Sequence, residues 1–426
     1  MKYNIDTYEL YRNEMLSPFS IRLKVTMKEE VDIDILKKSV KTALTRYPYL
    51  AVKVRVDEDG AYVLEPNDNE IVVIRTPKKP LGLGSKETNG YLFYVECEGR
   101  DIFFVISHAL CGGGGTFPWV MTNVWQYVKD RYGVEPFAPE IRKPGEPLLE
   151  FECAQPDLSM LSDEDPLYKY QSKNPAQLLK DYINGLFNPF KSNPHFYLFT
   201  FDQKDIMNFA RDNDASVVSF FMVAVAKALD KVLPEKDKVI GIETAHNTVE
   251  NLGVPGCHSD ILSHICIDIE REKLKWDIDK LHTMVRGQII LRSDLSVDSI
   301  ELRQKFELYE KLDTIKGLKN KRAYAKKGDV STGKGAKHGT AIVNYTGRTD
   351  WGEVADYVES YSPIAGGHVL CEICSLSDKI FMTMMHLVDN RKYLNAFKSV
   401  MDELGIPCTV AGPYPKLLPK HDLPKK

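Results

Sequence analysis

A chain of 426 residues is long enough for two domains of ordinary size, each with its own hydrophobic core. Its 43% hydrophobic and 27% charged residues are typical of a globular protein, and a formal net charge of −4 excludes a global field that would attract nucleic acid or an anionic membrane. No segment approaches about 18 uninterrupted apolar residues, and the first residues lack the apolar core of a signal peptide, so we expect a cytoplasmic protein with no membrane span.

The first part of the chain alternates predicted strands with one clear helix. A strand is expected at Ser20 to Met27, and apolar residues then recur at helical spacing after a capping Asp32 as far as Tyr47, where Pro48 ends the helix. Two hairpins follow, at residues 51–56 with 61–64 and at residues 91–97 with 101–107. The last of these strands ends at His108.

A segment rich in proline and acidic residues, 142–194, is typical of a connector, with a short helix near residues 176–186. A second series of elements follows, so we expect one lobe over residues 1–175 and another over 176–426. The predicted elements of the second lobe are a strand at 197–201, a buried helix at 216–229, strands at 239–244 and 261–269, a long charged helix at 273–309 and a hairpin at 368–388. The overall prediction is two lobes of mixed α/β structure, each a sheet flanked by helices.

One short internal similarity supports two related lobes. Residues 103–108, Phe-Phe-Val-Ile-Ser-His, resemble residues 381–386, Phe-Met-Thr-Met-Met-His, and each is an apolar strand that ends in a histidine before a helix. Chance and a pseudo-repeat both explain a match of this length. We interpret His386 as a core or strand-end histidine.

The most informative segment surrounds His108. Residues 106–120, Ile-Ser-His-Ala-Leu-Cys-Gly-Gly-Gly-Gly-Thr-Phe-Pro-Trp-Val, resemble the HxxxDG signature of the chloramphenicol-acetyltransferase-like acyltransferases. This superfamily includes peptide-synthetase condensation domains, wax ester synthases and stand-alone bacterial alcohol acetyltransferases. The histidine and Gly113 keep the spacing of the signature, whereas its aspartate position is Gly112.

The resemblance covers most of the chain, and alcohol acetyltransferases are the most similar members. Four further segments resemble the family: its first helix with the Tyr-Pro end, the buried helix that opens the second lobe, a crossover strand with Asn and Gly, and the terminal strand and helix. In this sequence they are residues 45–54, 214–229, 342–348 and 380–407.

The resemblance implies a tunnel between the lobes in which His108 acts as general base. Imidazole is suited to take the proton of an acceptor near neutral pH, and the oxyanion of the tetrahedral intermediate needs a donor. The implied donor substrate is acyl-CoA or the phosphopantetheine of an acyl carrier protein, with no tightly bound cofactor. Candidates to contact substrate or the oxyanion are Asn344, Tyr345, Thr346, Gly112, Gly113, His246 and Asn247.

The missing aspartate leaves two interpretations open. In the family this carboxylate is read as structural, so a chain without it can retain catalysis, and glycine permits a positive φ that would preserve the turn. The alternative is a degenerate site in which His108 only packs.

A basic segment lies between Lys316 and Lys337, with eight Lys or Arg and one acidic residue, Asp329. It is either a solvated loop or a patch that attracts the phosphates of the donor, with Lys326, Lys327 and Lys334 as candidate contacts. Residues 328–335 have the spacing of a Walker A loop but lack its hydroxyl residue and a preceding apolar strand, so we do not assign nucleotide hydrolysis.

The eight cysteines are scattered, which favours reduced, buried thiols over disulfides. Neither the residues around Cys257 and His264 nor those around Cys371 complete a tetrahedral set, so no metal site is predicted. Cys111 is a second candidate nucleophile, although nothing in the sequence marks a lowered pKa.

The sequence thus predicts transfer of an acyl group, acetyl by default, to a hydroxyl or amine of a small apolar acceptor. Two alternatives remain: a free-standing condensation-type domain that forms amides, and a non-catalytic binding or scaffold protein. The acceptor, the acyl chain length and the oligomeric state are not predicted.

Overall fold

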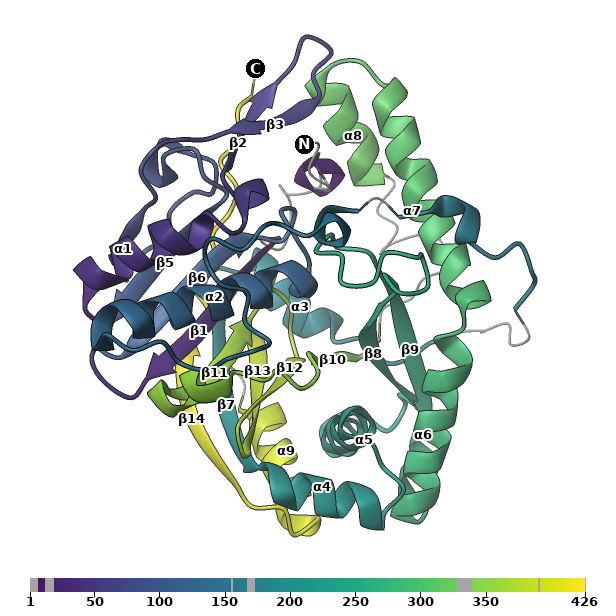
Figure 1. Cartoon of the computed structure of the whole chain (residues 1–426). Coiled ribbons are helices and arrows are strands. Elements are labelled where there is room, and N and C mark those ends of the chain that lie inside the picture. The colour runs from purple at the N-terminus through teal and green to yellow at the C-terminus, as the bar shows by residue number, and fades with distance from the viewer. Residues whose placement is uncertain are drawn as a thin grey trace.

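The computed structural model describes residues 7–11, 19–154, 156–166, 173–327, 339–389 and 391–425 (Figure 1). The α-helices are α1 Ile33–Leu44, α2 Gly113–Tyr132, α3 Leu179–Phe187, α4 Gln203–Asp212, α5 Val217–Asp230, α6 Ile278–Arg292, α7 Leu295–Thr314, α8 Leu318–Lys327 and α9 Lys392–Glu403. The strands are β1 Ser20–Met27, β2 Val52–Val56, β3 Tyr62–Pro66, β4 Val73–Arg75, β5 Phe93–Glu98, β6 Asp101–Ser107, β7 Ser192–Asp202, β8 Val239–Asn247, β9 Leu262–Glu270, β10 Ala341–Tyr345, β11 Val358–Ile364, β12 Leu370–Leu376, β13 Lys379–Val388 and β14 Cys408–Pro415.

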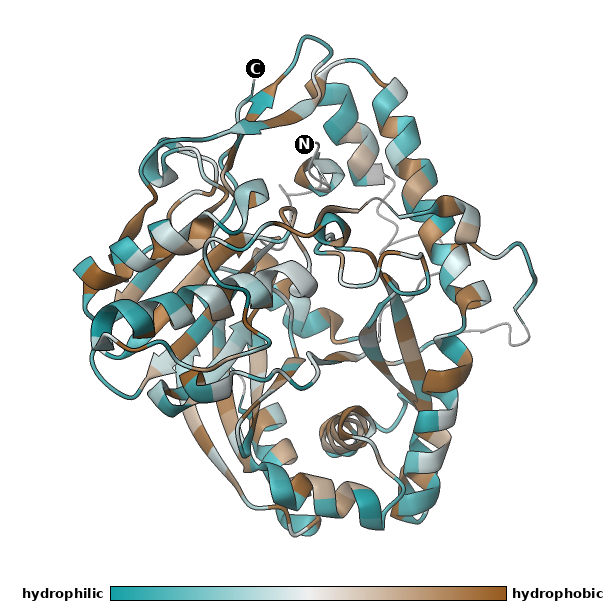
Figure 2. Cartoon of the chain, viewed as in Figure 1, coloured by the Kyte–Doolittle hydropathy of each residue, from teal (hydrophilic) through white to brown (hydrophobic). Residues whose placement is uncertain are grey.

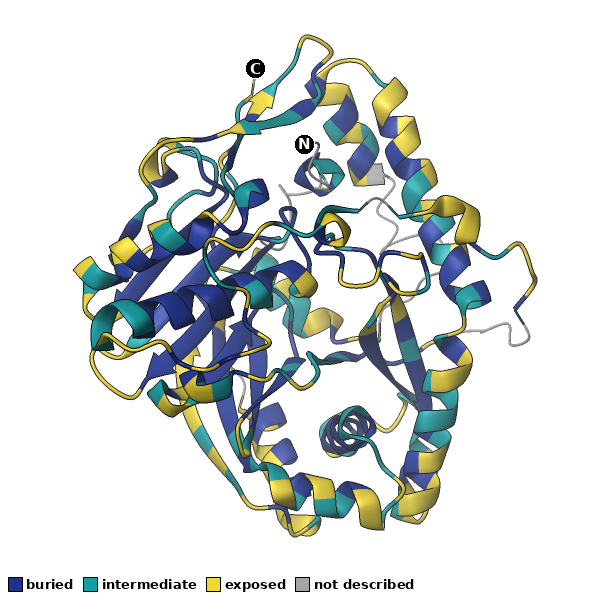
Figure 3. Ribbon diagram, in the orientation of Figure 1, coloured by how far each residue is buried: buried dark blue, intermediate teal, exposed yellow. Residues whose placement is uncertain are grey.

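The first sheet has the strand order β11-β1-β6-β5-β4 and is mixed, because β4 pairs with β5 in parallel while its other pairs are antiparallel. Strand β6 lies at its centre, and helices α1 and α2 lie side by side over one face (Figure 1). Asp32 begins α1 by accepting hydrogen bonds from the backbone N–H groups of Asp34 and Ile35, as its position in the sequence predicted. The strands of this sheet are almost entirely buried (Figure 3).

The second sheet has the order β14-β7-β13-β12-β10-β8-β9 and is also mixed. Helix α5 packs against β8, β10 and α9, and it is apolar and buried almost all round (Figures 2 and 3). Ser216 caps the first turn of α5 by accepting a hydrogen bond from the N–H of Ser219. No helix in the described part of the chain combines the length and the apolar character needed to cross a bilayer.

The two lobes are joined by a strand that crosses between them. Strand β11 belongs to the C-terminal half of the sequence, yet it forms an edge of the first sheet by pairing with β1. It also contacts β12 and β13 of the second sheet. The division of the chain at residue 175 stays a prediction, and the first sheet includes this strand from beyond that boundary.

The prediction of one long helix at residues 273–309 is wrong. A short 3-10 helix at Arg271–Lys275 is followed by α6 and α7, which are separate helices. Asp294 accepts a hydrogen bond of 3.0 Å from the N–H of Ser296 and so caps the start of α7. Apolar periodicity cannot reveal this break because a side-chain cap interrupts the helix without interrupting the pattern.

The two segments that resemble each other in sequence occupy similar places. Strand β6 follows β5 in a hairpin and precedes α2, and β13 follows β12 in a hairpin and precedes α9. His386 is fully buried, as predicted, and its ring stacks on that of His195 with the centroids 5.2 Å apart. The two related positions have therefore diverged, since His108 keeps an exposed edge.

Candidate functional site

His108 follows directly after β6, whose residues from Ile102 to Ser107 are buried. The backbone N–H of His108 donates a hydrogen bond of 3.0 Å to the carbonyl of Phe19, just before β1. The imidazole lies 4.9 Å from the Phe19 ring between centroids, and 25% of the side-chain surface is exposed. A well-packed central strand thus holds an accessible histidine at its end.

The glycines after His108 allow a segment of the second lobe to approach closely. A Cβ added at Gly112 would lie 2.8 Å from Oδ1 of Asp260, and one added at Gly115 would lie 2.9 Å from Cβ of His258. Gly112 has a φ of −75°, so the expectation that glycine provides a positive φ is wrong. The N–H of Gly112 donates a hydrogen bond of 3.1 Å to the carbonyl of His258, and Gly113 begins α2.

This approach places a carboxylate beside the histidine. Nδ1 of His108 lies 3.3 Å from Oδ2 of Asp260, whose side chain is 10% exposed. Nδ1 of His108 and Oδ1 of Asp260 are both buried and, within the described residues, have no hydrogen-bond partner. A carboxylate at Nδ1 can hold the imidazole in the tautomer that leaves Nε2 free to accept a proton.

His258 anchors the segment that carries Asp260. Its Nδ1 lies 2.7 Å from the hydroxyl of Tyr49, and its backbone N–H donates to the carbonyl of Glu152 at 3.0 Å. Glu152 in turn accepts hydrogen bonds of 2.7 and 2.9 Å from Arg46, and both side chains are almost fully buried. Burial lowers the pKa of His258 to about 4, so this histidine is neutral near pH 7 and serves as a packing and hydrogen-bonding group.

A half-buried carboxyl group that the sequence analysis missed lies near His108. Asn344 donates a hydrogen bond of 2.7 Å to Oε1 of Glu372. Burial raises the pKa of Glu372 to about 7, while Asn344 and the nearby charge of His108 oppose that rise. The signal in the sequence is one acidic residue in a largely apolar strand at 370–376, but its closeness to Asn344 depends on the pairing of β10 with β12.

The other candidates at the end of β10 and just after it, Tyr345 and Thr346, are engaged with the second sheet. The N–H of Thr346 donates to the carbonyl of Ile373 at 2.9 Å, and Tyr345 packs against the core of the second lobe. Burial raises the pKa of Tyr345. Their roles in binding substrate stay predictions, as does that of Gly113.

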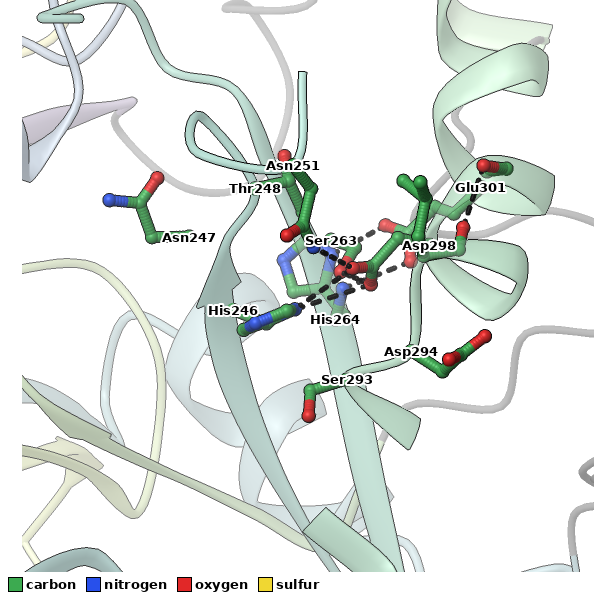
Figure 4. Close-up of polar contacts among 12 residues, drawn as sticks. His246, Asn247, Thr248, Asn251, Ser263, His264, Ser293, Asp294, Asp298 and Glu301 are labelled. Atoms are coloured by element: carbon green, nitrogen blue, oxygen red, sulfur yellow. Dashed lines mark hydrogen bonds and ion pairs between the residues drawn. The ribbon is translucent and has the colours of Figure 1, made fainter. Parts of the chain in front are cut away.

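His246 lies in a separate polar cluster between β8, β9 and α7 (Figure 4). Its Nδ1 lies 3.2 Å from Oδ2 of the buried Asp298, which also accepts hydrogen bonds of 2.5 Å from Ser263 and 3.3 Å from Asn251. Asn247 is exposed and points away from this cluster (Figure 4). These contacts hold His246 at the end of β8 and leave its role toward substrate a prediction.

Cys111 is buried, and its Sγ lies 3.3 Å from the hydroxyl of Thr116. Burial raises the pKa of the Cys111 thiol to about 12, so the thiolate needed for nucleophilic attack is scarce near pH 7. The described part of the chain contains no group of three or more His, Cys, Asp or Glu side chains placed to hold a metal ion.

Part of the basic segment is used within the fold. Lys321 is buried and donates a hydrogen bond of 2.5 Å to the carbonyl of Leu312, and Arg322 donates one to the hydroxyl of Tyr62. Lys326 is exposed near the end of α8. The side chain of Lys327, the whole of Lys334 and the Walker-like residues 328–335 lie outside the described residues.

No protein-family model matches the chain, and no curated protein matches it in sequence. Solved structures with low sequence identity do match along its length. Polyketide synthase associated protein 5 from Mycobacterium tuberculosis has a TM-score of 0.58 at 13% identity, with 94% of this chain and 96% of that chain covered. TRI101 from F. graminearum, in complex with coenzyme A and T-2 mycotoxin, has a TM-score of 0.56 at 12% identity, covering 97% of this chain and 100% of that one.

Two further matches extend the comparison. TRI3, a trichothecene 15-O-acetyltransferase from Fusarium sporotrichioides, has a TM-score of 0.53 at 11% identity, with 95% of each chain covered. The EpoB cyclization-docking bidomain from Sorangium cellulosum has a TM-score of 0.52 at 10% identity, covering 94% of this chain and 83% of that one. The chain therefore shares with these structures the two-lobed, mixed α/β fold that the sequence predicted from its resemblance to the chloramphenicol-acetyltransferase-like superfamily.

Proposed function

We propose that the protein is an acyltransferase in which His108 is the general base. The donor is an acyl-CoA, acetyl by default, or an acyl-loaded carrier protein, and the acceptor is a hydroxyl or amine of a small apolar molecule. The observation that carries this proposal is the placement of His108, with Nδ1 buried beside Asp260 while part of the imidazole is exposed. That arrangement suits proton transfer at Nε2.

The proposed reaction balances without a covalent enzyme intermediate. Nε2 of His108 takes the proton of the acceptor as its oxygen or nitrogen forms a bond to the thioester carbonyl carbon. The tetrahedral intermediate then collapses, the carbon–sulfur bond breaks, and the departing thiolate receives the proton from Nε2. The remaining amide hydrogen of Asn344 is a candidate donor to the oxyanion, because an amide nitrogen carries two hydrogens and Glu372 accepts only one of them.

The comparisons support acyl transfer through the fold. One structure similar to this chain is an acetyltransferase, and another was determined with coenzyme A and a small-molecule toxin. The cyclization-docking bidomain has a similar TM-score, 0.52 against 0.53 for TRI3, so the fold accommodates both types of reaction and does not rank them. The condensation-type reaction is therefore the second candidate, and the reaction product distinguishes the two.

The direct test measures thiol release from acyl-CoAs of increasing chain length and from an acyl carrier protein, with a panel of alcohols and amines as acceptors. His108→Gln is expected to lower kcat roughly 10²–10⁴-fold, the usual contribution of a general base. His264→Gln is the matched control, because His264 is a half-exposed histidine paired with Glu301 at 2.8 Å. This control is expected to keep the activity.

Three results would contradict the proposal in different ways. Full activity in His108→Gln refutes the base role. No thiol release from any donor favours a binding or scaffold protein, and an amide product that forms only from two carrier-bound substrates favours the condensation-type reaction.

A further inference from the structure

Gly112, the position that departs from the acyltransferase signature, is packed against Asp260 from the other lobe. A Cβ at Gly112 would lie 2.8 Å from Oδ1 and 3.1 Å from Cα of Asp260. Real Cβ atoms essentially never approach other atoms more closely than 3.0 Å, so a side chain at position 112 and Asp260 in its present place exclude each other. A side chain at position 112 would therefore require Asp260 to shift, whereas the φ of −75° imposes no requirement for glycine.

Asp260 is held where it is from two sides. On the side of the first lobe, the N–H of Gly112 donates to the carbonyl of His258, two residues before Asp260, at 3.1 Å. On the side of the second lobe, Lys305 on α7 donates a hydrogen bond of 2.9 Å to the backbone carbonyl of Asp260. The carboxylate is therefore positioned by the backbone around it, as a group that orients another side chain must be.

His108 is a group that this carboxylate can orient. Oδ2 of Asp260 lies 3.3 Å from Nδ1 of His108. A buried carboxylate oxygen and a buried ring nitrogen each cost free energy while they lack a partner. A hydrogen bond from Nδ1–H to Asp260 would satisfy the ring nitrogen, and contacts of this kind shorten when the imidazole gains positive charge.

We infer that Asp260, supplied by the second lobe, is the positioning residue of His108, and that it fills the space beside Gly112, where the first lobe lacks the aspartate of the signature. Asp260 holds the proton on Nδ1, keeps Nε2 free to accept the proton of the acceptor, and stabilises the imidazolium that forms. The lobes must be docked for this pair to exist, so the base is complete only in the assembled two-lobed fold. The catalytic part of this inference depends on the proposed acyltransferase function, whereas the pairing itself does not.

The first test concerns the pairing and needs no substrate. Nitrogen-15 NMR of the imidazoles reports which ring nitrogen carries the proton, and the His108 signals are assigned by their loss in His108→Gln. In the wild type we expect the neutral ring to carry its proton on Nδ1 and none on Nε2. Asp260→Asn should change the His108 signals and leave those of His246 unchanged, because Asp298 holds that ring. Asp298→Asn should do the reverse.

The second test concerns catalysis and uses the same variants. Asp260→Asn is expected to lower kcat by roughly tenfold to a hundredfold, because the carboxylate that orients His108 is lost. The KM for either substrate should change little, since the binding surfaces remain. Asp260→Glu should recover part of kcat, since it restores a carboxylate. Glu301→Gln, which removes the partner of the half-exposed His264, is the control that should leave kcat unchanged.

The third test asks whether Asp260 fills the space that a side chain at position 112 would need. Gly112→Ala is expected to lower Tm because the new Cβ meets Asp260, and Asp260→Gly in the same chain should remove most of that loss. If Gly112→Ala lowers Tm equally in the wild type and in Asp260→Gly, Asp260 does not occupy this space, and that part of the inference is overturned.

The outcomes separate this inference from the proposed function. Unchanged His108 signals in Asp260→Asn overturn the pairing, even if the protein is an active acyltransferase. Changed signals together with an unchanged kcat overturn the positioning role. Changed signals in a protein that consumes no acyl donor would confirm the pairing while the proposed function fails.

Discussion

Asn344 bridges two elements of the second sheet by donating to Oε1 of Glu372 at 2.7 Å and accepting from the N–H of Ala245 at 2.9 Å. Glu372 is thereby held in a position where burial raises its pKa to about 7. A carboxyl group that titrates near neutral pH close to a histidine is uncommon outside functional sites. It also makes the stability of the protein depend on pH.

The first prediction follows from the sign of that pKa change. Because the folded state keeps the Glu372 proton up to about pH 7 while the unfolded chain loses it near its ordinary value of 4.5, stability from this group is greatest below pH 4.5 and falls as the pH rises through 7. Glu372→Gln removes this loss. The free energy of unfolding of the variant, relative to that of the wild type, should therefore rise by on the order of 2–3 kcal/mol from pH 5 to pH 8, as measured by urea unfolding. Glu58→Gln, on an exposed turn, should give no such gain.

A second prediction concerns the buried ion pair beneath the His258 anchor. Glu152→Gln leaves the guanidinium of Arg46 buried with only a neutral partner, which should cost about 3–5 kcal/mol of the free energy of unfolding. The double variant Arg46→Met with Glu152→Leu removes both charges and should be less destabilised than the single variant. Denaturant unfolding of the wild type, Arg46→Met, Glu152→Leu and the double variant measures the coupling, and additive losses would contradict it.

A third prediction concerns Cys111, whose thiol has its pKa raised to about 12 by burial. Since the thiol stays protonated near pH 7, Cys111→Ala should retain kcat, and mass spectrometry during turnover should detect no acyl group on the protein. An acyl adduct in the wild type that disappears in Cys111→Ala would instead make Cys111 the nucleophile.

A fourth prediction tests the basic segment as a donor-binding patch. Charge reversal at Lys326 and Lys327 should raise the KM for acyl-CoA several-fold at low salt, with a smaller effect at high salt, because salt screens exposed charges. The KM for the acceptor should not change. Lys37→Glu, an exposed lysine on α1 in the first lobe, is the control and should leave both constants unchanged. An unchanged KM for the donor in the double reversal would refute the patch.

Much of the fold was predictable because its signals are local. The alternation of apolar residues and the turn residues predicted β1, the β2–β3 and β5–β6 hairpins and β12–β13, and the apolar run at 216–229 predicted α5. Two features escaped these signals. The break between α6 and α7 is made by one capping side chain, and the membership of β11 in the first sheet depends on a pairing with β1 from the opposite half of the chain.

The candidate site likewise has a part that the sequence predicted and a part that only the tertiary structure showed. The sequence by itself determined that a histidine ends an apolar strand ahead of four glycines, which is enough to indicate the fold and the residue on which the proposed chemistry depends. Only the tertiary structure decided what stands beside it: Asp260 from the second lobe next to Nδ1, and Glu372 beside Asn344. Residues so far apart in sequence meet through the packing of sheets and loops, and hydrophobic periodicity carries no information about that packing.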